Sequence, residues 1–248
     1  MGTLLLLFIA FFLVFNVIPK YPYIYVSKGT KLINEGSIEE GLKIFKKAAD
    51  SKNVDYMTKI RYVFTELKLG DIKKAKEKIS YILAEKKLPP GMRYEAKAVF
   101  ALILFKEGEI EDAKELMTEV YENYKNTNMY CTLGYLFNIL EEPEAAVKFN
   151  LEAYEYNDSH NTILDNLGQA YYLNGENKKA RETYEKLMDN SPSFPEAYYN
   201  YALVLLKDNE KELAKEMLER ALGKPFNNLT TVTEDEIKNE IERITQDE

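Results

Sequence analysis

The side chains with the greatest potential for catalysis are the single cysteine, Cys131, and the single histidine, His160. A thiol and an imidazole that meet can act as a nucleophile and its general base. Cys131 falls within a helical pattern, whereas His160 follows the polar residues Asn157-Asp158-Ser159, where a loop is expected. We therefore expect Cys131 to be a small groove or core residue and His160 to be a solvated loop residue. One Cys and one His cannot form a tetrahedral zinc site without carboxylates, so the sequence predicts no catalytic residue and no metal ligand.

Other signatures of enzymes and of nucleic-acid-binding proteins are missing from the sequence. The glycines are dispersed along the chain and not clustered as in a phosphate-binding loop. Groups of acids such as Glu141, Glu142 and Glu144 come at expected turns and helix starts, where they favourably oppose the helix dipole. The formal net charge of −8 is opposite to the basic footprint of a nucleic-acid-binding protein. The sequence thus predicts no enzyme, no cofactor and no nucleic-acid partner.

The helices that must position these residues recur along the chain. Residues 161–194 contain two helical patterns separated by Asn174-Gly175. The turn position of this unit recurs as Gly36, Gly70, Gly108, Glu141, Gly175 and Asn209. A small residue follows each turn five places later, as Gly41, Ala75, Ala113, Ala146, Ala180 and Ala214. The spacings of 34, 38, 33, 34 and 34 residues are too regular for chance.

This order of large, small and aromatic positions, closed by Pro192, resembles the tetratricopeptide repeat (TPR), a helix–turn–helix module of 34 residues. The resemblance implies an all-α fold, a TPR-like solenoid whose six repeats cover residues 21–232. The expected repeats start near Pro22, Tyr56, Tyr94, Thr127, Asn161 and Pro195. Before the third repeat, the excess residues Leu88-Pro89-Pro90-Gly91 are expected to form a loop. Residues 233–248 are expected to add a capping helix, because Thr233-x-x-Glu236 is a capping box.

Small residues are expected where the two helices of a pair cross closely, since only Gly or Ala lets the backbones approach. The predicted crossings place Gly29, Gly134 and Gly168 on the first helices opposite Gly41, Ala146 and Ala180 on the second. The glycines at the turn positions are expected to adopt positive φ at low steric cost. Aromatic residues at regular positions then fill the space between pairs, so we interpret them as core packing and not as a cofactor site.

The first 18 residues carry no charged side chain, and residues 4–15 are an unbroken apolar run. As a helix they would span about 27 Å, near the lower limit for crossing a bilayer core. Tyr21, Tyr23 and Tyr25 follow, as expected for an aromatic belt at the headgroup level. We therefore expect residues 1–20 to form an N-terminal transmembrane helix. A cleaved signal peptide is the alternative, but no basic n-region and no A-x-A-like cleavage site is present.

The charges that follow this segment predict its orientation. Because Lys20, Lys28 and Lys31 come directly after it, the positive-inside rule places the repeats in the cytoplasm. The alternative is an exported envelope-assembly or secretion factor with its repeats outside the cytoplasm. Residues 20–100 contain 18 Lys and Arg against 10 Asp and Glu, whereas residues 101–248 contain 15 against 31. The basic part is hypothesised to lie near anionic lipids, the alternative being that its lysines only solvate outer helix faces.

The resemblance also implies a binding surface, because TPR proteins usually hold a peptide or helix in the concave groove lined by their first helices. The groove positions of repeats four to six give the candidate partner-binding residues Tyr135, Asn138, Asp165, Gln169, Tyr172 and Tyr199. Tyrosines offer stacking surfaces, and amides and acids suit polar and basic side chains. The carboxylate clamp of chaperone-binding relatives needs Lys and Asn at the fifth and ninth positions of a repeat. Here those positions hold Cys131 and Tyr135, Asp165 and Gln169, and Tyr199 and Leu203. The sequence therefore predicts a membrane-tethered scaffold that binds a protein or peptide partner without catalysis.

Overall fold

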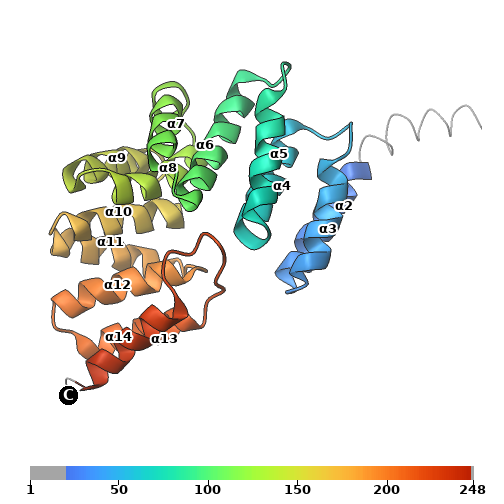
Figure 1. The fold of residues 1–248 in the computed structure, drawn as a ribbon. Helices are drawn as coiled ribbons and strands as arrows, with labels where there is room; N and C mark the ends of the chain where they lie inside the picture. The colour runs from blue at the N-terminus through green and yellow to red at the C-terminus, as the bar shows by residue number, and fades with distance from the viewer. Residues whose placement is uncertain (1–20, 247–248) are drawn as a thin grey trace, which may run out of the picture. The chain divides into compact units, whose positions relative to one another are not determined.

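The computed structural model describes residues 21–246, and over these residues it contains helices and no strand (Figure 1). The all-α prediction is therefore confirmed for this part of the chain. The predicted transmembrane helix, residues 1–20, lies outside the described residues. The helices are α2 (Tyr21–Asn34), α3 (Ile38–Ala49), α4 (Tyr56–Leu69), α5 (Ile72–Ala84), α6 (Pro90–Glu107), α7 (Ile110–Asn123), α8 (Thr127–Leu140), α9 (Pro143–Tyr156), α10 (Asn161–Leu173), α11 (Asn177–Asp189), α12 (Pro195–Lys207), α13 (Lys211–Leu222) and α14 (Glu234–Gln246).

The observed helix starts lie within one residue of five of the six expected repeat starts. The difference is at α6, which begins at Pro90, four residues before the expected start at Tyr94. The prediction that Leu88-Pro89-Pro90-Gly91 forms a loop was wrong for Pro90 and Gly91. Proline fits the first turn of a helix because no intrahelical partner exists there for a backbone N–H. The amide of Arg93 already donates to the carbonyl of Pro89 over 2.9 Å.

The described residues divide into two compact units, residues 21–103 and 104–246, with the boundary inside α6. In the first unit α2 packs on α3, α3 on α4, and α4 on α5. In the second unit α10 contacts both α8 and α12, so three successive first helices lie next to one another. This row of α8, α10 and α12 is the surface on which the groove residues were expected. Residues 21–246 include no helix that is both long and apolar enough to cross a membrane.

The turn glycines adopt positive φ at three of the expected positions, with values of 87° at Gly36, 85° at Gly108 and 75° at Gly175. Asn209 takes the same role in the last repeat with a φ of 62°. At Gly175 the next amide, that of Glu176, donates to the carbonyl of Tyr171 over 2.8 Å, which closes the end of α10. Gly70 has a φ of −124°, so the expectation of positive φ was wrong there.

The close helix crossings follow the prediction in the first repeat and depart from it later. A Cβ placed on Gly29 would lie 2.8 Å from the carbonyl oxygen of Gly41, as expected of two backbones in contact. A Cβ on Gly168 would instead meet the ring of Tyr184, and one on Gly134 would meet the amide of Asn150. The predicted opposition to Ala146 and Ala180 stays a prediction, because the nearest atoms belong to residues one helical turn further along. Tyr184 and Asn150 each lie four residues after the expected alanine on the same helix face.

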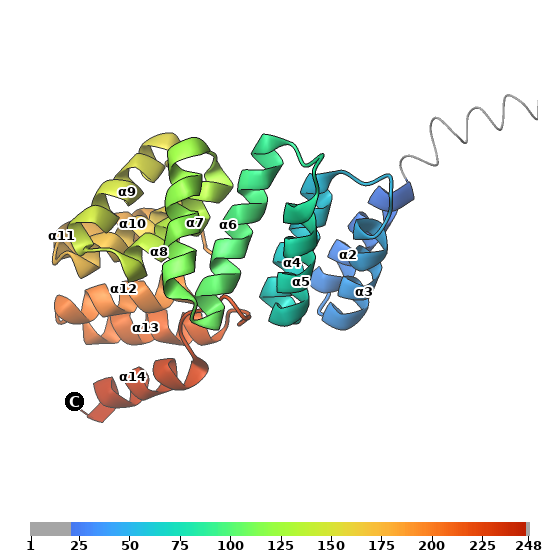
Figure 2. The same ribbon diagram turned by 45° about the horizontal axis from the view of Figure 1, so that its top comes forward.

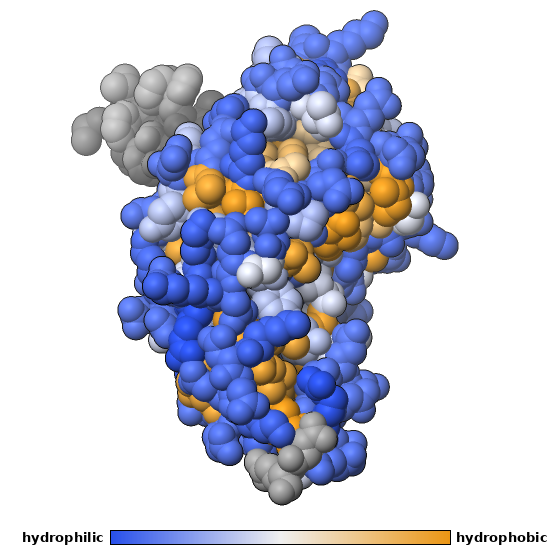
Figure 3. All heavy atoms as spheres, turned by 90° about the vertical axis from the view of Figure 1, so that its left-hand side faces the viewer, coloured by the Kyte–Doolittle hydropathy of each residue, from blue (hydrophilic) through white to orange (hydrophobic). Residues whose placement is uncertain are grey.

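The C-terminal capping helix, α14, packs against α13 at the end of the second unit (Figure 2). Its capping box is formed as predicted: the amide of Thr233 donates to Glu236 over 2.7 Å, and the amide of Glu236 donates to the Thr233 hydroxyl over 3.2 Å. Ile237 and Ile244 enter the hydrophobic core of the second unit. On the face drawn in Figure 3, hydrophobic side chains form separate patches within a largely hydrophilic surface.

Candidate functional site

Cys131 and His160 meet in the structure. Cys131 is on α8, His160 immediately precedes α10, and the Cys131 Sγ lies 3.3 Å from the His160 Nδ1. His160 is half-buried and not a solvated loop residue. The sequence held a signal for this contact, because the two residues are 29 positions apart, close to one repeat, and neighbouring first helices touch.

The electrostatics of this pair do not favour a nucleophile. Burial raises the pKa of the Cys131 thiol to about 12, although a hydrogen bond with Thr162 acts in the opposite direction. Burial also lowers the pKa of His160. Both groups are therefore neutral at pH 7, whereas a cysteine nucleophile acts as its thiolate. Among the described residues, no group of three or more His, Cys, Asp or Glu side chains converges in a way that could hold a metal ion.

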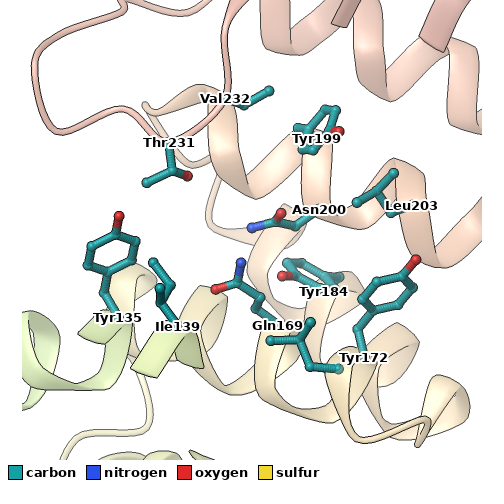
Figure 4. A pocket seen from close by; sticks show the side chains of 11 residues that line it. Tyr135, Ile139, Gln169, Tyr172, Tyr184, Tyr199, Asn200, Leu203, Thr231 and Val232 are labelled. Atoms are coloured by element: carbon teal, nitrogen blue, oxygen red, sulfur yellow. The ribbon is translucent and has the colours of Figure 1, made fainter. Parts of the chain in front are cut away.

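A pocket of about 270 Å³ lies where α8, α10 and α12 meet the connector, residues 223–233, between α13 and α14 (Figure 4). We call it the tyrosine pocket. Its polar and aromatic walls come from Tyr135, Tyr172, Tyr184, Tyr199, Gln169 and Asn200, with aliphatic side chains between them. Tyr135, Gln169, Tyr172 and Tyr199 come from three successive first helices, so they share one face of the row. These are four of the six candidate partner-binding residues.

The other two candidates, Asn138 and Asp165, lie beneath the pocket and each is only 7% exposed. The Asn138 amide donates to the carbonyl of Asn166 over 2.8 Å and to Gln169 Oε1 over 3.0 Å. It also accepts from Asn150 Nδ2 over 2.8 Å. Asn138 therefore supports Gln169 from below, and direct contact of Asn138 with a partner stays a prediction.

Asp165 lies in a similar position beneath Tyr184 and Asn200. The Tyr184 hydroxyl lies 3.3 Å from Asp165 Oδ1, and Asn200 Nδ2 donates to the same oxygen over 3.3 Å. Burial, reinforced by the negative charge of Glu196, raises the pKa of the Asp165 carboxyl to about 7. Because this pKa lies near pH 7, the carboxyl can gain or lose its proton at small free-energy cost. Direct contact of Asp165 with a partner also stays a prediction.

Carboxylates also act on the pocket from its sides. Burial and the charge of Glu196 raise the pKa of Tyr135 to about 12. The pKa of Tyr172 and that of Tyr199 are raised by burial and by Glu240 of α14. The tyrosines therefore stay protonated in a field of negative charge.

The connector is the part of the site that the sequence analysis missed. Its turn is held locally, since Asn227 accepts from the amide of Leu229 over 3.0 Å and the Thr230 hydroxyl accepts from the amide of Asn227 over 2.9 Å. The amide of Thr231 then donates to Glu196 over 3.0 Å. Val232 is buried in the core, so Thr231 and Val232 close one side of the pocket. A spacing signal for this closure was not available, because the connector lies outside the repeats.

Comparison with known proteins gives a family for part of the chain. Residues 168–209, which run from α10 to the turn after α12, match the family model described as TPR repeat. A TPR repeat-containing protein of Methanocaldococcus jannaschii is 26% identical over 170 residues, which cover 68% of this chain and 29% of that protein. The chain spans less than a third of the length of the curated relatives that it matches.

Solved structures extend the similarity to nearly the whole chain. A tetratricopeptide repeat protein from Parabacteroides merdae has a TM-score of 0.66 at 16% identity, over 95% of this chain and 89% of that one. The APC/C hetero-tetramer Cut9–Hcn1 has a TM-score of 0.68 at 15% identity, over 94% of this chain and 44% of that one. At these identities the similarity shows the fold alone, a solenoid of helical repeats.

Proposed function

Because this chain carries repeats of the tetratricopeptide family, we propose that it is a membrane-tethered scaffold that holds a segment of a partner protein in the tyrosine pocket and the groove around it. Proteins of this family bind protein or peptide partners, and one structural neighbour is itself a complex of two different proteins. The observation that carries the proposal is the pocket, which three successive first helices line with Tyr135, Gln169, Tyr172 and Tyr199.

The composition of the pocket supports docking and not chemistry. Aromatic side chains supply large rigid contact area at low entropic cost, and they are enriched among the residues that dominate binding energies. The polar groups beneath the pocket are held in hydrogen bonds of the fold, so its surface is preorganised before a partner arrives.

Site-specific crosslinking tests whether a partner occupies this groove. A photoreactive phenylalanine derivative at Tyr172 is expected to capture the partner in cells, whereas the same residue at Tyr156 is not. Tyr156 is 53% exposed and is absent from the pocket walls, which makes it a matched control. Tyr199→Ala should then reduce the yield at position 172. Equal capture from positions 172 and 156 would show that partners meet the protein elsewhere.

The membrane tether and the orientation are supported by the sequence: the uncharged run over residues 1–18 and the lysines that follow it. A reporter fused after Glu248 tests the orientation. Activity of a reporter that works only in the cytoplasm supports cytoplasmic repeats. Activity of one that works only after export supports the alternative, an exported envelope-assembly or secretion factor.

A further inference from the structure

We propose that the tyrosine pocket receives one positively charged side chain, a lysine or an arginine, of the partner segment. This inference rests on the proposed function and adds the chemistry by which the partner is recognised. The pocket volume of about 270 Å³ is below the roughly 300–1,000 Å³ of sites that enclose drug-sized ligands. A single side chain therefore suits it better than a folded element.

The walls of the pocket are suited to a cation. Tyr135, Tyr172 and Tyr199 surround the space from three different helices (Figure 4). The face of an aromatic ring attracts a cation within about 6 Å, most strongly where water is excluded. Arg and Lys also carry aliphatic stems, which would pack on Ile139 and Leu203 between the rings.

The charges around the pocket favour a cationic occupant over an aliphatic one. Glu196 acts on Tyr135 at one side of the pocket, and Glu240 acts on Tyr172 and Tyr199 at another. None of the side chains that line the pocket is itself charged, so an entering cation meets no like charge in the walls. An acidic surrounding of this kind favours a basic side chain and repels an acidic one.

The basic groups near the pocket do not outweigh these acids. Lys106 interacts with Glu196, so these two charges oppose each other. Arg243 is paired with Glu240 over 2.7 Å. The second unit as a whole, residues 104–248, carries 15 Lys and Arg against 31 Asp and Glu. The surrounding potential is therefore negative, which would also attract a basic segment from a distance.

Asp165 gives the pocket a means of responding to the cation. Its carboxyl lies behind Tyr184 and Asn200, both of which line the pocket. A positive charge in the pocket would favour the ionised carboxylate, because opposite charges stabilise each other across a low-dielectric space. A neutral occupant would leave the ionisation of Asp165 nearly unchanged.

Short peptides that differ at one position test this assignment on the full chain in detergent micelles. The probes are the capped peptides Ala-Ala-Lys-Ala-Ala and Ala-Ala-Arg-Ala-Ala, with norleucine and glutamate versions as the neutral and acidic counterparts. Binding is followed through NMR signals of labelled tyrosines, assigned with Tyr172→Phe and Tyr199→Phe. We expect the lysine and arginine peptides to bind about tenfold more tightly than the norleucine peptide, and the glutamate peptide to bind least.

Two charge variants locate the source of the preference. Glu196→Gln and Glu240→Gln should each reduce the preference for lysine over norleucine about threefold or more. Glu219→Gln on α13 makes the same change at an exposed position away from the pocket and should leave the preference unchanged. Norleucine binding should be unaltered in all three variants, which shows that each is folded.

The outcomes separate the two proposals. Equal or tighter binding of the norleucine peptide at Tyr172 and Tyr199 would overturn the cation assignment while leaving a peptide-binding groove in place. Binding of no peptide at these tyrosines would overturn the cation assignment and, together with an absence of crosslinks from position 172, the proposed function as well.

Discussion

The side chain of Asp165 is more than nine-tenths buried and lies next to Tyr184 and Asn200. Its pKa of about 7 in the folded state lies above the value of about 3.9 for an unfolded Asp. Between these two values the folded state binds more protons than the unfolded state. The free energy of unfolding must therefore fall as pH rises from about 4 to about 7 and then level off. One pKa unit is about 1.4 kcal/mol, so the loss from this group is about 4 kcal/mol at most.

Asp165→Asn should remove this pH dependence. The amide cannot ionise, so the variant should be more stable than the wild type at pH 8 and close to it at pH 4. Urea unfolding followed by circular dichroism at several pH values measures the difference. Asp189→Asn, at an exposed position on α11, is the matched control and should unfold like the wild type across the range. If Asp165→Asn leaves the pH profile unaltered, the pKa of Asp165 is the same in the folded and unfolded states.

Cys131 makes a second prediction at the scale of single residues. With a pKa of about 12, the thiol has far less thiolate at pH 8 than a free cysteine, whose pKa is about 8.5. Alkylation of the folded protein by iodoacetamide should be at least about a hundredfold slower than that of free cysteine. In denaturant the two rates should become equal, and mass spectrometry of the single alkylated site reports both. Fast alkylation in the folded state would indicate an activated thiol and restore the Cys131–His160 pair as a catalytic candidate.

Helix packing accommodates an amide in the fourth repeat where the other repeats have a large apolar or aromatic side chain. Asn150 occupies the position of Phe45 in the first repeat and Tyr184 in the fifth. It is fully buried, with its Nδ2 donating to Asn138 over 2.8 Å and to the carbonyl of Ala146 over 3.0 Å. Its Oδ1 has no hydrogen-bond partner among the described residues. The preceding residue, Phe149, places an aromatic ring nearby, and this ring stacks on Phe137 at a centroid distance of 4.1 Å. Gly134 makes room for the amide, since it lies directly opposite Asn150.

Gly134→Ala should therefore destabilise the second unit. The new methyl group would overlap the Asn150 amide oxygen and lie 2.7 Å from Asn166 Nδ2, so both amides must leave their hydrogen bonds. The expected cost is about 1–3 kcal/mol, reduced by up to about 1 kcal/mol because alanine favours helices over glycine. Thermal unfolding followed by circular dichroism measures the change. Gly223→Ala is the control, because there a Cβ would come no closer than 3.4 Å to another atom and φ is −78°. If both variants melt alike, the crossing at Gly134 has room that the structure does not show.

At the scale of elements, the repeat pattern predicted the helices well because every repeat must bury the same face. It could not predict α6, since a proline before a repeat fits a loop and a first helical turn equally well. It selected Tyr135, Gln169, Tyr172 and Tyr199, which line one pocket, and their contact with a partner stays a prediction. It could not separate those residues from Asn138 and Asp165, because one helical face includes both surface positions and the layer below them. The connector was missed because Thr231, which contacts Glu196, lies outside the repeats and has no equivalent position in them.

At the scale of the whole molecule, the two structural units carry net charges of opposite sign. Residues 1–103 contain 18 Lys and Arg against 10 Asp and Glu, whereas residues 104–248 contain 15 against 31. In the first unit, exposed lysines gather on α3 at Lys43, Lys46 and Lys47, and on α5 at Lys73 and Lys74. Tyr81 on α5 is 79% exposed, and tyrosines of this kind are favoured at the interface between a membrane and water. These features support the hypothesis that the first unit faces anionic lipid.

Vesicle binding by residues 21–248, which lack the apolar run, tests this hypothesis without the tether. Binding to vesicles that contain phosphatidylserine should exceed binding to phosphatidylcholine vesicles and should be lost at high salt, because a lysine near an anionic surface contributes about 1 kcal/mol. Lys46→Glu with Lys47→Glu should weaken binding at least about tenfold. Lys178→Glu with Lys207→Glu changes the net charge equally, but at exposed positions of the acidic unit, and should have little effect. Sedimentation of the three proteins with vesicles measures binding, and equal loss of binding in both double variants would point to net charge alone. No preference for phosphatidylserine in the wild type would mean that the lysines only solvate the outer faces of their helices.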